Sequence, residues 1–185
     1  MVIKMKKTAV VYASKYGTTK RYAEWIAQAL SCDIFEQGAI KAGRLKAYEV
    51  VIYGGGLYAG GVRGINLIRK NFDPADGRRW ILFTCGLADP GDPDNAAHIR
   101  EGLGKALEPR ILRELQVFHL RGGIDYARLG VVHKAMMAML HKTLSGKDRA
   151  ALREEDRQML DTYGTAVDFT DRAAIEPILS YVRAL

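Results

Sequence analysis

Short apolar segments alternate along the chain with segments in which apolar residues recur at helical spacing. The first apolar segment is residues 8–13, and it reads as one uninterrupted run, as expected for a strand covered on both faces. The later segments are residues 32–35, 50–53, 80–84 and 116–120. This alternation predicts an α/β fold built on a parallel sheet of five strands.

The intervening segments predict the helices. Residues 19–30 place Tyr22, Ile26 and Leu30 on one face, and a further helix is expected around residues 65–72. Asp92 followed by Pro93 is typical of a helix start, and Pro109 is expected to end that helix. The last helix is expected at residues 175–182. Right-handed crossovers through such helices predict a doubly wound sheet with helices on both faces, in a single domain of residues 1–185.

Residues 122–168, here called the insertion, lie between the fifth predicted strand and the last helix. Two helical stretches are expected in it, at residues 129–144 and 151–167. The first is rich in methionine and places Leu129, Val132, Met136, Met139 and Leu140 on one side. His133, Lys134, His141 and Lys142 occupy the other side, with Val131, Met137 and Ala138 among them. The pattern fits either a packed helix or a basic, apolar surface that faces a quinone, a porphyrin or a membrane.

Composition and charge narrow the functional classes. The 185 residues are 48% hydrophobic and carry a net charge of +7, and no apolar run approaches the length that spans a bilayer. Two cysteines and no recognisable secretory signal predict a cytoplasmic protein. Residues 110–149 hold 8 basic and 3 acidic side chains, which favours an anionic ligand, partner or membrane surface. Nucleic acid is not expected, because no recognition motif accompanies the charge, and no metal site is expected either.

The loop Ser14-Lys15-Tyr16-Gly17-Thr18-Thr19 follows the first predicted strand directly. Hydroxyl groups, a glycine and backbone N–H groups at a helix N-terminus are typical of an anion-binding turn. The loop lacks the second glycine and Lys-Ser/Thr pair of a Walker A loop, and it lacks the G-x-G-x-x-G pattern of dinucleotide-binding folds. An ordinary polar N-cap turn is the alternative interpretation.

The same loop resembles the phosphate loop of the flavodoxin family, which reads T/S-x-T-G-x-T. Ser14, Gly17, Thr18 and Thr19 fit that pattern, whereas Tyr16 replaces the usual threonine and Lys15 adds a cation. The resemblance implies a flavodoxin-like sheet of order 2-1-3-4-5 and an FMN cofactor whose phosphate lies in this loop.

The flavodoxin resemblance also assigns two further loops to the flavin ring. The loop after the third strand would border the ring with residues Gly55, Gly56, Leu57, Tyr58, Ala59 and Gly60. The loop after the fourth strand would cover the other side with residues Cys85, Gly86, Leu87 and Ala88. Cys85 is expected to be a small buried residue rather than a redox thiol.

The segment from Gly122 to Leu129, followed by the Met-rich helix, is similar to the insertion of the menaquinone-dependent protoporphyrinogen IX dehydrogenases. That resemblance implies an FMN-dependent oxidoreductase whose partners are a quinone and a porphyrin-like substrate, with peripheral membrane contact through the basic insertion. No side chain stands out as a catalytic acid or base. Two alternatives stay open: a flavodoxin-type electron carrier between protein partners, and a flavin-free interaction module.

Overall fold

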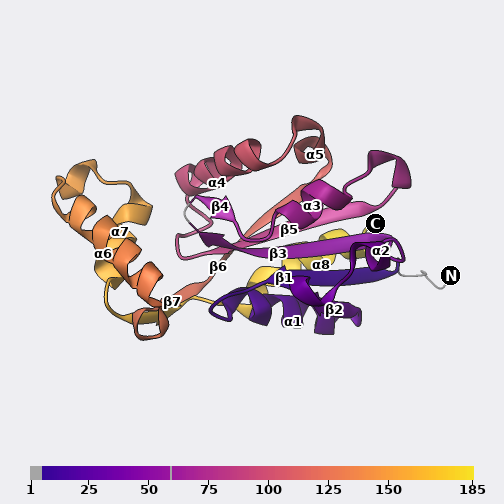
Figure 1. Cartoon of the computed structure of the whole chain (residues 1–185), viewed down its shortest axis with the longest axis horizontal. Coiled ribbons are helices and arrows are strands. Elements are labelled where there is room, and N and C mark those ends of the chain that lie inside the picture. The colour runs from indigo at the N-terminus through magenta and orange to yellow at the C-terminus, as the bar shows by residue number, and fades with distance from the viewer. Residues whose placement is uncertain (1–5, 59) are drawn as a thin grey trace.

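The computed structural model describes residues 6–58 and 60–185, and its centre is a twisted parallel sheet (Figure 1). In the described residues the strand order is β2-β1-β3-β5-β6, and all four pairings along this path are parallel. The strands are β1 (Thr8–Ala13), β2 (Asp33–Glu36), β3 (Val50–Tyr58), β5 (Arg79–Gly86) and β6 (Gln116–Arg121). These are the five predicted strands, and β5 and β6 are the fourth and fifth of them because β4 is an additional short strand. The predicted order 2-1-3-4-5 is therefore confirmed.

Two strands extend further than the sequence indicates. β3 continues through the glycines to Tyr58, where Leu57 and Tyr58 pair with the two-residue antiparallel strand β4 (Gly61–Val62). β5 continues to Gly86. The prediction that Gly55, Gly56, Leu57 and Tyr58 form a loop is therefore wrong, and so is the placement of Cys85 and Gly86 in one.

The glycines lie in β3 because its neighbours leave no room for side chains. A Cβ on Gly54 would overlap the ring of Phe83 in β5, and one on Gly55 would overlap Val62 of β4. The sequence therefore resembles a flexible turn at a place where the sheet requires close approach.

Helices cover both faces of the sheet, as predicted (Figure 1). On one face, α1 and α8 pack on alternate strand residues such as Val10, Ile52 and Phe83. On the other face, α3, α4 and α5 pack on the intervening residues, such as Val11 and Leu82. The helices are α1 (Thr18–Leu30), α2 (Ala42–Leu45), α3 (Asn66–Asn71), α4 (Pro93–Ala106), α5 (Pro109–Glu114) and α8 (Glu176–Arg183).

The insertion lies beyond the carboxyl ends of the strands and projects away from the sheet (Figure 1). It begins with β7 (Gly123–Asp125) and ends with β8 (Ala166–Asp168), which pair as an antiparallel ribbon. Between them are α6 (Val131–Ser145) and α7 (Glu154–Thr162). The predicted second helix, residues 151–167, is thus too long, because its last residues form β8.

The Met-rich helix α6 is packed only in part. His133 and Leu144 are buried, whereas Val131 and Val132 are 85% and 75% exposed and Met139 is 72% exposed. The prediction that His133 lies on a polar side, away from the packed residues, is wrong. Among the described residues, no helix is both long and apolar enough to cross a membrane.

Candidate functional site

The predicted phosphate loop forms the turn between β1 and α1. Gly17 is the N-cap of α1 and has φ 101°, a left-handed conformation that favours glycine. Its N–H donates to Ser14 Oγ at 3.1 Å, which closes the turn. A Cβ on Gly17 would have no atom within 4 Å, so the space beside Gly17 is open.

The first turn of α1 carries backbone donors beside this open space. Among the described residues, none accepts a hydrogen bond from the N–H groups of Thr18, Thr19 or Lys20. The first backbone hydrogen bond of the helix is the one that the Arg21 N–H donates to Gly17 O. Unpaired N–H groups at a helix N-terminus carry partial positive charge and attract anions. The turn therefore has the donor set that a phosphate requires.

The threonine hydroxyls face the sheet as well as the turn. Cys85 Sγ donates to Thr18 Oγ1 at 3.5 Å, and Thr19 is 3% exposed beside Gly56. Burial raises the pKa of the Cys85 thiol, an effect that hydrogen bonding with Thr18 and Thr19 partly opposes. Cys85, at 5% exposure, therefore packs as a neutral thiol.

The two regions expected to border a flavin ring contact each other. A Cβ on Gly86 would lie 2.7 Å from Leu57 Cδ1, so Leu57 of β3 packs directly on the end of β5. Leu87 and Ala88 follow in the loop and are half-buried, and the Leu87 carbonyl accepts from Arg121 Nε at 3.2 Å. Gly60 is exposed with φ 78°, and Ala59 lies outside the described residues.

A residue of the insertion reaches this site. His133 of α6 is 7% exposed, and its Nδ1 contacts the Tyr16 hydroxyl, while its Nε2 lies 3.3 Å from Lys15 Nζ. Its ring lies 4.4 Å from the ring of Tyr58, whose hydroxyl donates to Met136 Sδ at 3.6 Å. The insertion thus touches both the phosphate loop and the end of β3.

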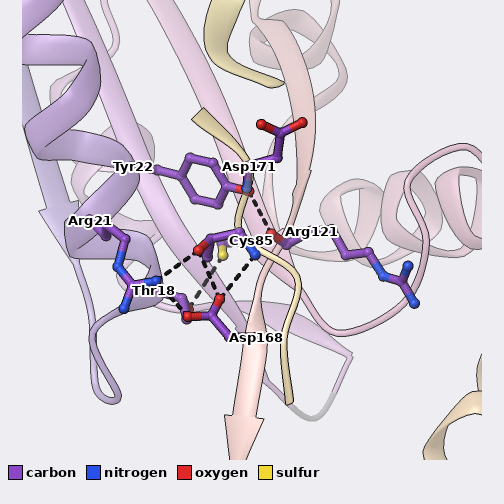
Figure 2. Close-up of polar contacts among 8 residues, drawn as sticks. Thr18, Arg21, Tyr22, Cys85, Arg121, Asp168 and Asp171 are labelled. Atoms are coloured by element: carbon purple, nitrogen blue, oxygen red, sulfur yellow. Dashed lines mark hydrogen bonds and ion pairs between the residues drawn. The ribbon is translucent and has the colours of Figure 1, made fainter. Parts of the chain in front are cut away.

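A second contact joins the insertion to α1 (Figure 2). Arg21 Nη1 lies 2.5 Å from Asp168 Oδ2 of β8, and it also donates to Thr170 Oγ1 at 2.7 Å. The Arg21 hydrogen bond is the main cause that lowers the pKa of Asp168. At the start of the insertion, the Gly122 N–H donates to Gly86 O at 2.6 Å.

Tyr22 holds the chain on both sides of the insertion against α1 (Figure 2). Its hydroxyl donates to Arg121 O at 2.7 Å and accepts from the Asp171 N–H at 3.0 Å. Sequence reasoning missed His133, Gly122 and the Arg21–Asp168 pair as parts of the site. Only the paired glycines 122 and 123 gave a signal, since they mark close backbone approach.

A cavity of about 490 Å³ opens beside the loop, lined by Ser14, Gln37 and Arg63 among others. A larger one, of about 830 Å³, lies beside Lys46, Glu49 and other residues at the amino ends of the strands. Ligands of open parallel α/β sheets bind at the carboxyl ends, so the smaller cavity is the relevant one for the phosphate loop.

The fold and this turn agree with a sequence comparison. Residues 9–150 match the family model described as a flavodoxin domain. The chain belongs to the flavodoxin family. Membership supports FMN as the cofactor, as the phosphate loop predicts. No curated protein matches the chain.

Several solved structures are similar to part of the chain. A WrbA-like flavodoxin from Agrobacterium tumefaciens is 22% identical with a TM-score of 0.42, over 62% of this chain and 83% of that one. A flavoprotein from Lactobacillus acidophilus, solved in complex with FMN, is 14% identical with a TM-score of 0.40, over 63% and 92%. The Trp repressor binding protein from Bacillus subtilis is 14% identical with a TM-score of 0.44, over 63% and 83%.

The residues of the turn fit the phosphate end of FMN. The left-handed Gly17 has open space beside it, and three N–H groups in the first turn of α1 have no acceptor in the described chain. Beyond this turn, Leu57 packs on Gly86 and Tyr58 packs on His133. The fit to FMN therefore rests on the phosphate turn.

Proposed function

We propose that this chain binds FMN through the turn Ser14–Thr19 and acts as an oxidoreductase similar to the menaquinone-dependent protoporphyrinogen IX dehydrogenases. The observation that carries the binding proposal is the set of unpaired N–H groups at Thr18, Thr19 and Lys20 beside the open Gly17. Bound FMN would supply the ability to accept electrons from an organic donor and to release them to a quinone.

The chain's own residues would bind and enclose the cofactor. The N-terminus of α1 would hold the phosphate, and Leu57, Tyr58, Gly86, Leu87 and Ala88 would border the ring. Leu57 packs on Gly86 and the Tyr58 ring packs on His133, while Tyr58 itself stays 42% exposed, so this end of the sheet is accessible to a planar ligand. No described side chain is assigned as a proton donor or acceptor.

The insertion supports a small-molecule partner for this site. α6 contacts the phosphate loop through His133 while exposing Val131, Val132, Met139 and Leu140. Residues 126–147 contain Arg128, Lys134, Lys142 and Lys147 but no Asp or Glu. A basic and apolar surface beside the cofactor site suits a carboxylated porphyrin, a quinone and the anionic membrane surface in which quinones reside.

The test of activity is an anaerobic reduction of the FMN-loaded protein. Protoporphyrinogen should bleach the flavin absorbance, and a menaquinone analogue should restore it as the quinone takes up electrons and protons to become the quinol. Flavin that stays oxidised with protoporphyrinogen, or stays reduced with the quinone, would contradict the dehydrogenase proposal.

The family match itself favours a second candidate, a flavodoxin-type electron carrier. A carrier would show two well-separated one-electron steps in a redox titration and would react with a protein reductase but not with free quinone. A single two-electron step together with rapid quinone reduction would favour the enzyme.

The binding site can be tested without substrate. Gly17→Ala should weaken FMN binding about tenfold, because an alanine in the left-handed region is strained by roughly 1–2 kcal/mol and the turn relaxes away. Gly130→Ala is the matched control, since Gly130 has φ −66° and open space around it. Equal FMN affinities in the two variants, measured by fluorescence quenching, would show that the turn is not part of the binding site.

A further inference from the structure

The contact between His133 and the phosphate loop restricts the chemical state of the histidine. Lys15 Nζ lies 3.3 Å from His133 Nε2, and an ammonium group has donors but no acceptor. Nε2 must therefore carry a lone pair, which places the ring proton on Nδ1. The Nδ1–H then donates to the Tyr16 oxygen. Only the neutral imidazole satisfies both partners.

The groups around His133 all disfavour a second ring proton. Lys15 of the loop and Arg63 after β4 are the charged side chains that act on it, and both are cations. Tyr16 and Tyr58 contribute neutral rings. Burial, followed by Lys15 and Arg63, lowers the pKa of His133 below its ordinary value of 6.5.

This contact also accounts for the two departures from the flavodoxin loop pattern. Tyr16 replaces the threonine of T/S-x-T-G-x-T and Lys15 adds a cation at its variable second position, and both side chains reach His133. The residues that keep the pattern, Gly17 among them, form the open turn and its donors. The loop therefore divides into a part that faces the anion site and a part that faces the insertion.

We propose that Lys15, Tyr16 and neutral His133 form a latch that holds α6 on the phosphate loop and couples the insertion to occupancy of the anion site. The coupling rests on the proposed function, because it requires a phosphate at the turn. A phosphate competes with His133 for the Lys15 ammonium, and it also offsets the positive potential that keeps His133 neutral. Any such coupling is reciprocal: the state of the latch changes phosphate affinity by the same factor.

The latch has a defined pH dependence. Since the pKa of His133 is lower in the folded chain than in the unfolded chain, the latch is fully formed above pH 6.5. It weakens as the pH falls through the lowered pKa, because a protonated ring presents an N–H to the Lys15 ammonium. Protonation of His133 therefore favours release of α6.

Hydrogen exchange of the FMN-free chain tests the docking. At pH 7.5, Tyr16→Phe and His133→Gln should speed exchange of the α6 amides about fivefold, which corresponds to one lost hydrogen bond. Tyr181→Phe is the control: it removes a tyrosine hydroxyl from α8, where the ring packs against Phe118 of β6. Unchanged α6 exchange in both latch variants would overturn the proposal.

Imidazole NMR tests the coupling, and the chain's four histidines make the spectrum simple. With the His133 signal assigned by its loss in His133→Gln, Lys15→Met should raise the pKa of His133, and Lys142→Met should leave it unchanged. Inorganic phosphate should raise the same pKa in the wild-type chain and have a smaller effect in Lys15→Met. Identical titrations in all these samples would overturn the latch.

The two proposals fail separately. If the chain retains no FMN, the proposed function fails, while the exchange and Lys15→Met results still decide whether the docking exists. If FMN binds but leaves the His133 titration unchanged, the coupling is wrong and the cofactor assignment stands.

Discussion

The parallel sheet and the insertion are both built from short elements with apolar residues, but they are stabilised differently. The sheet buries Ile52, Leu82 and Phe83 completely between two helical layers. The insertion has a much smaller apolar cluster of its own, centred on Leu144 and Met159. Large shared cores make a structure cooperative, whereas small peripheral ones allow local unfolding.

Polar and backbone contacts provide much of the connection between the two regions. Arg21 pairs with Asp168, His133 contacts the phosphate loop, and Arg121 at the end of β6 donates to Gln158 of α7. Such contacts fix an orientation but contribute less free energy than apolar burial. The comparison indicates that the insertion can move or unfold while the sheet remains intact.

The largest expected effect is in the sheet. Phe83→Ala should lower the free energy of unfolding by about 3–5 kcal/mol, because it empties a fully buried aromatic site. Urea unfolding followed by circular dichroism measures this loss. Val131→Ala, at a residue that is 85% exposed on α6, should change it by less than about 0.5 kcal/mol.

Gly54 gives this prediction an internal check. Gly54→Ala alone should be destabilising, since its methyl group would overlap the Phe83 ring. In the Phe83→Ala background the same methyl group enters the emptied space, so the second substitution should cost much less. Additive effects of the two changes would show that the rings and glycines of β3 and β5 are not packed as described.

A smaller, local effect is expected in the core of the insertion. Leu144→Ala removes the side chain of a 4% exposed residue and should destabilise this region by about 2–3 kcal/mol. Amide exchange should then accelerate in α6 and α7, with little change in the sheet. Leu140→Ala is the control on the same helix, because Leu140 is 42% exposed.

The Leu144→Ala result can contradict the comparison in a specific way. If exchange accelerates equally in β1, β3 and the insertion, the two regions unfold together. The insertion would then be part of the cooperative unit, and its polar contacts with the loop would be stronger than their exposure indicates.

The contrast also explains which features the sequence could predict. The central strands β1, β3 and β5 are buried over most of their length and therefore read as apolar runs, whereas the edge strands β2 and β6 are mostly unburied and were identifiable from shorter apolar runs. The same reasoning missed the ends of β3 and β5. Gly54 and Gly55 resemble a turn in the local sequence, which does not show that Phe83 and Val62 pack against them. Glycine in a strand reports on a neighbour that the local sequence does not contain.

Only the part of the site that is formed by residues adjacent in sequence was predictable. The turn around Gly17 follows from a few adjacent residues, and the structure places them together at the start of α1. His133 was assigned to the polar side of its helix, because periodicity cannot reveal a partner such as Tyr16, 117 positions away. The ribbon of β7 and β8 has strands of three residues, too short for a pattern to identify.

The smallest effect is expected at the ion pair between the two regions. Asp168→Asn should weaken docking of β8 by less than about 1 kcal/mol, because the Arg21 and Asp168 side chains are 45% and 50% exposed and water screens them. The pKa of Asp168 is lowered, mainly by the Arg21 hydrogen bond. The contribution is therefore complete above the ordinary value of 3.8 and is lost as the pH falls through the lowered pKa.

The Arg21–Asp168 pair can be distinguished from an ordinary surface pair by the region in which amide exchange changes when the pair is removed. Glu24→Gln removes the similarly exposed Lys20–Glu24 pair, which lies within α1 and joins no other element. At pH 7 and low salt, Asp168→Asn should increase amide exchange in β7 and β8, whereas Glu24→Gln should not. High salt should reduce the difference, since it screens exposed charges. An Asp168→Asn chain with wild-type exchange in the ribbon would mean that the ion pair does not contribute to docking of β7 and β8, which backbone pairing and the Gly122–Gly86 contact would then hold in place.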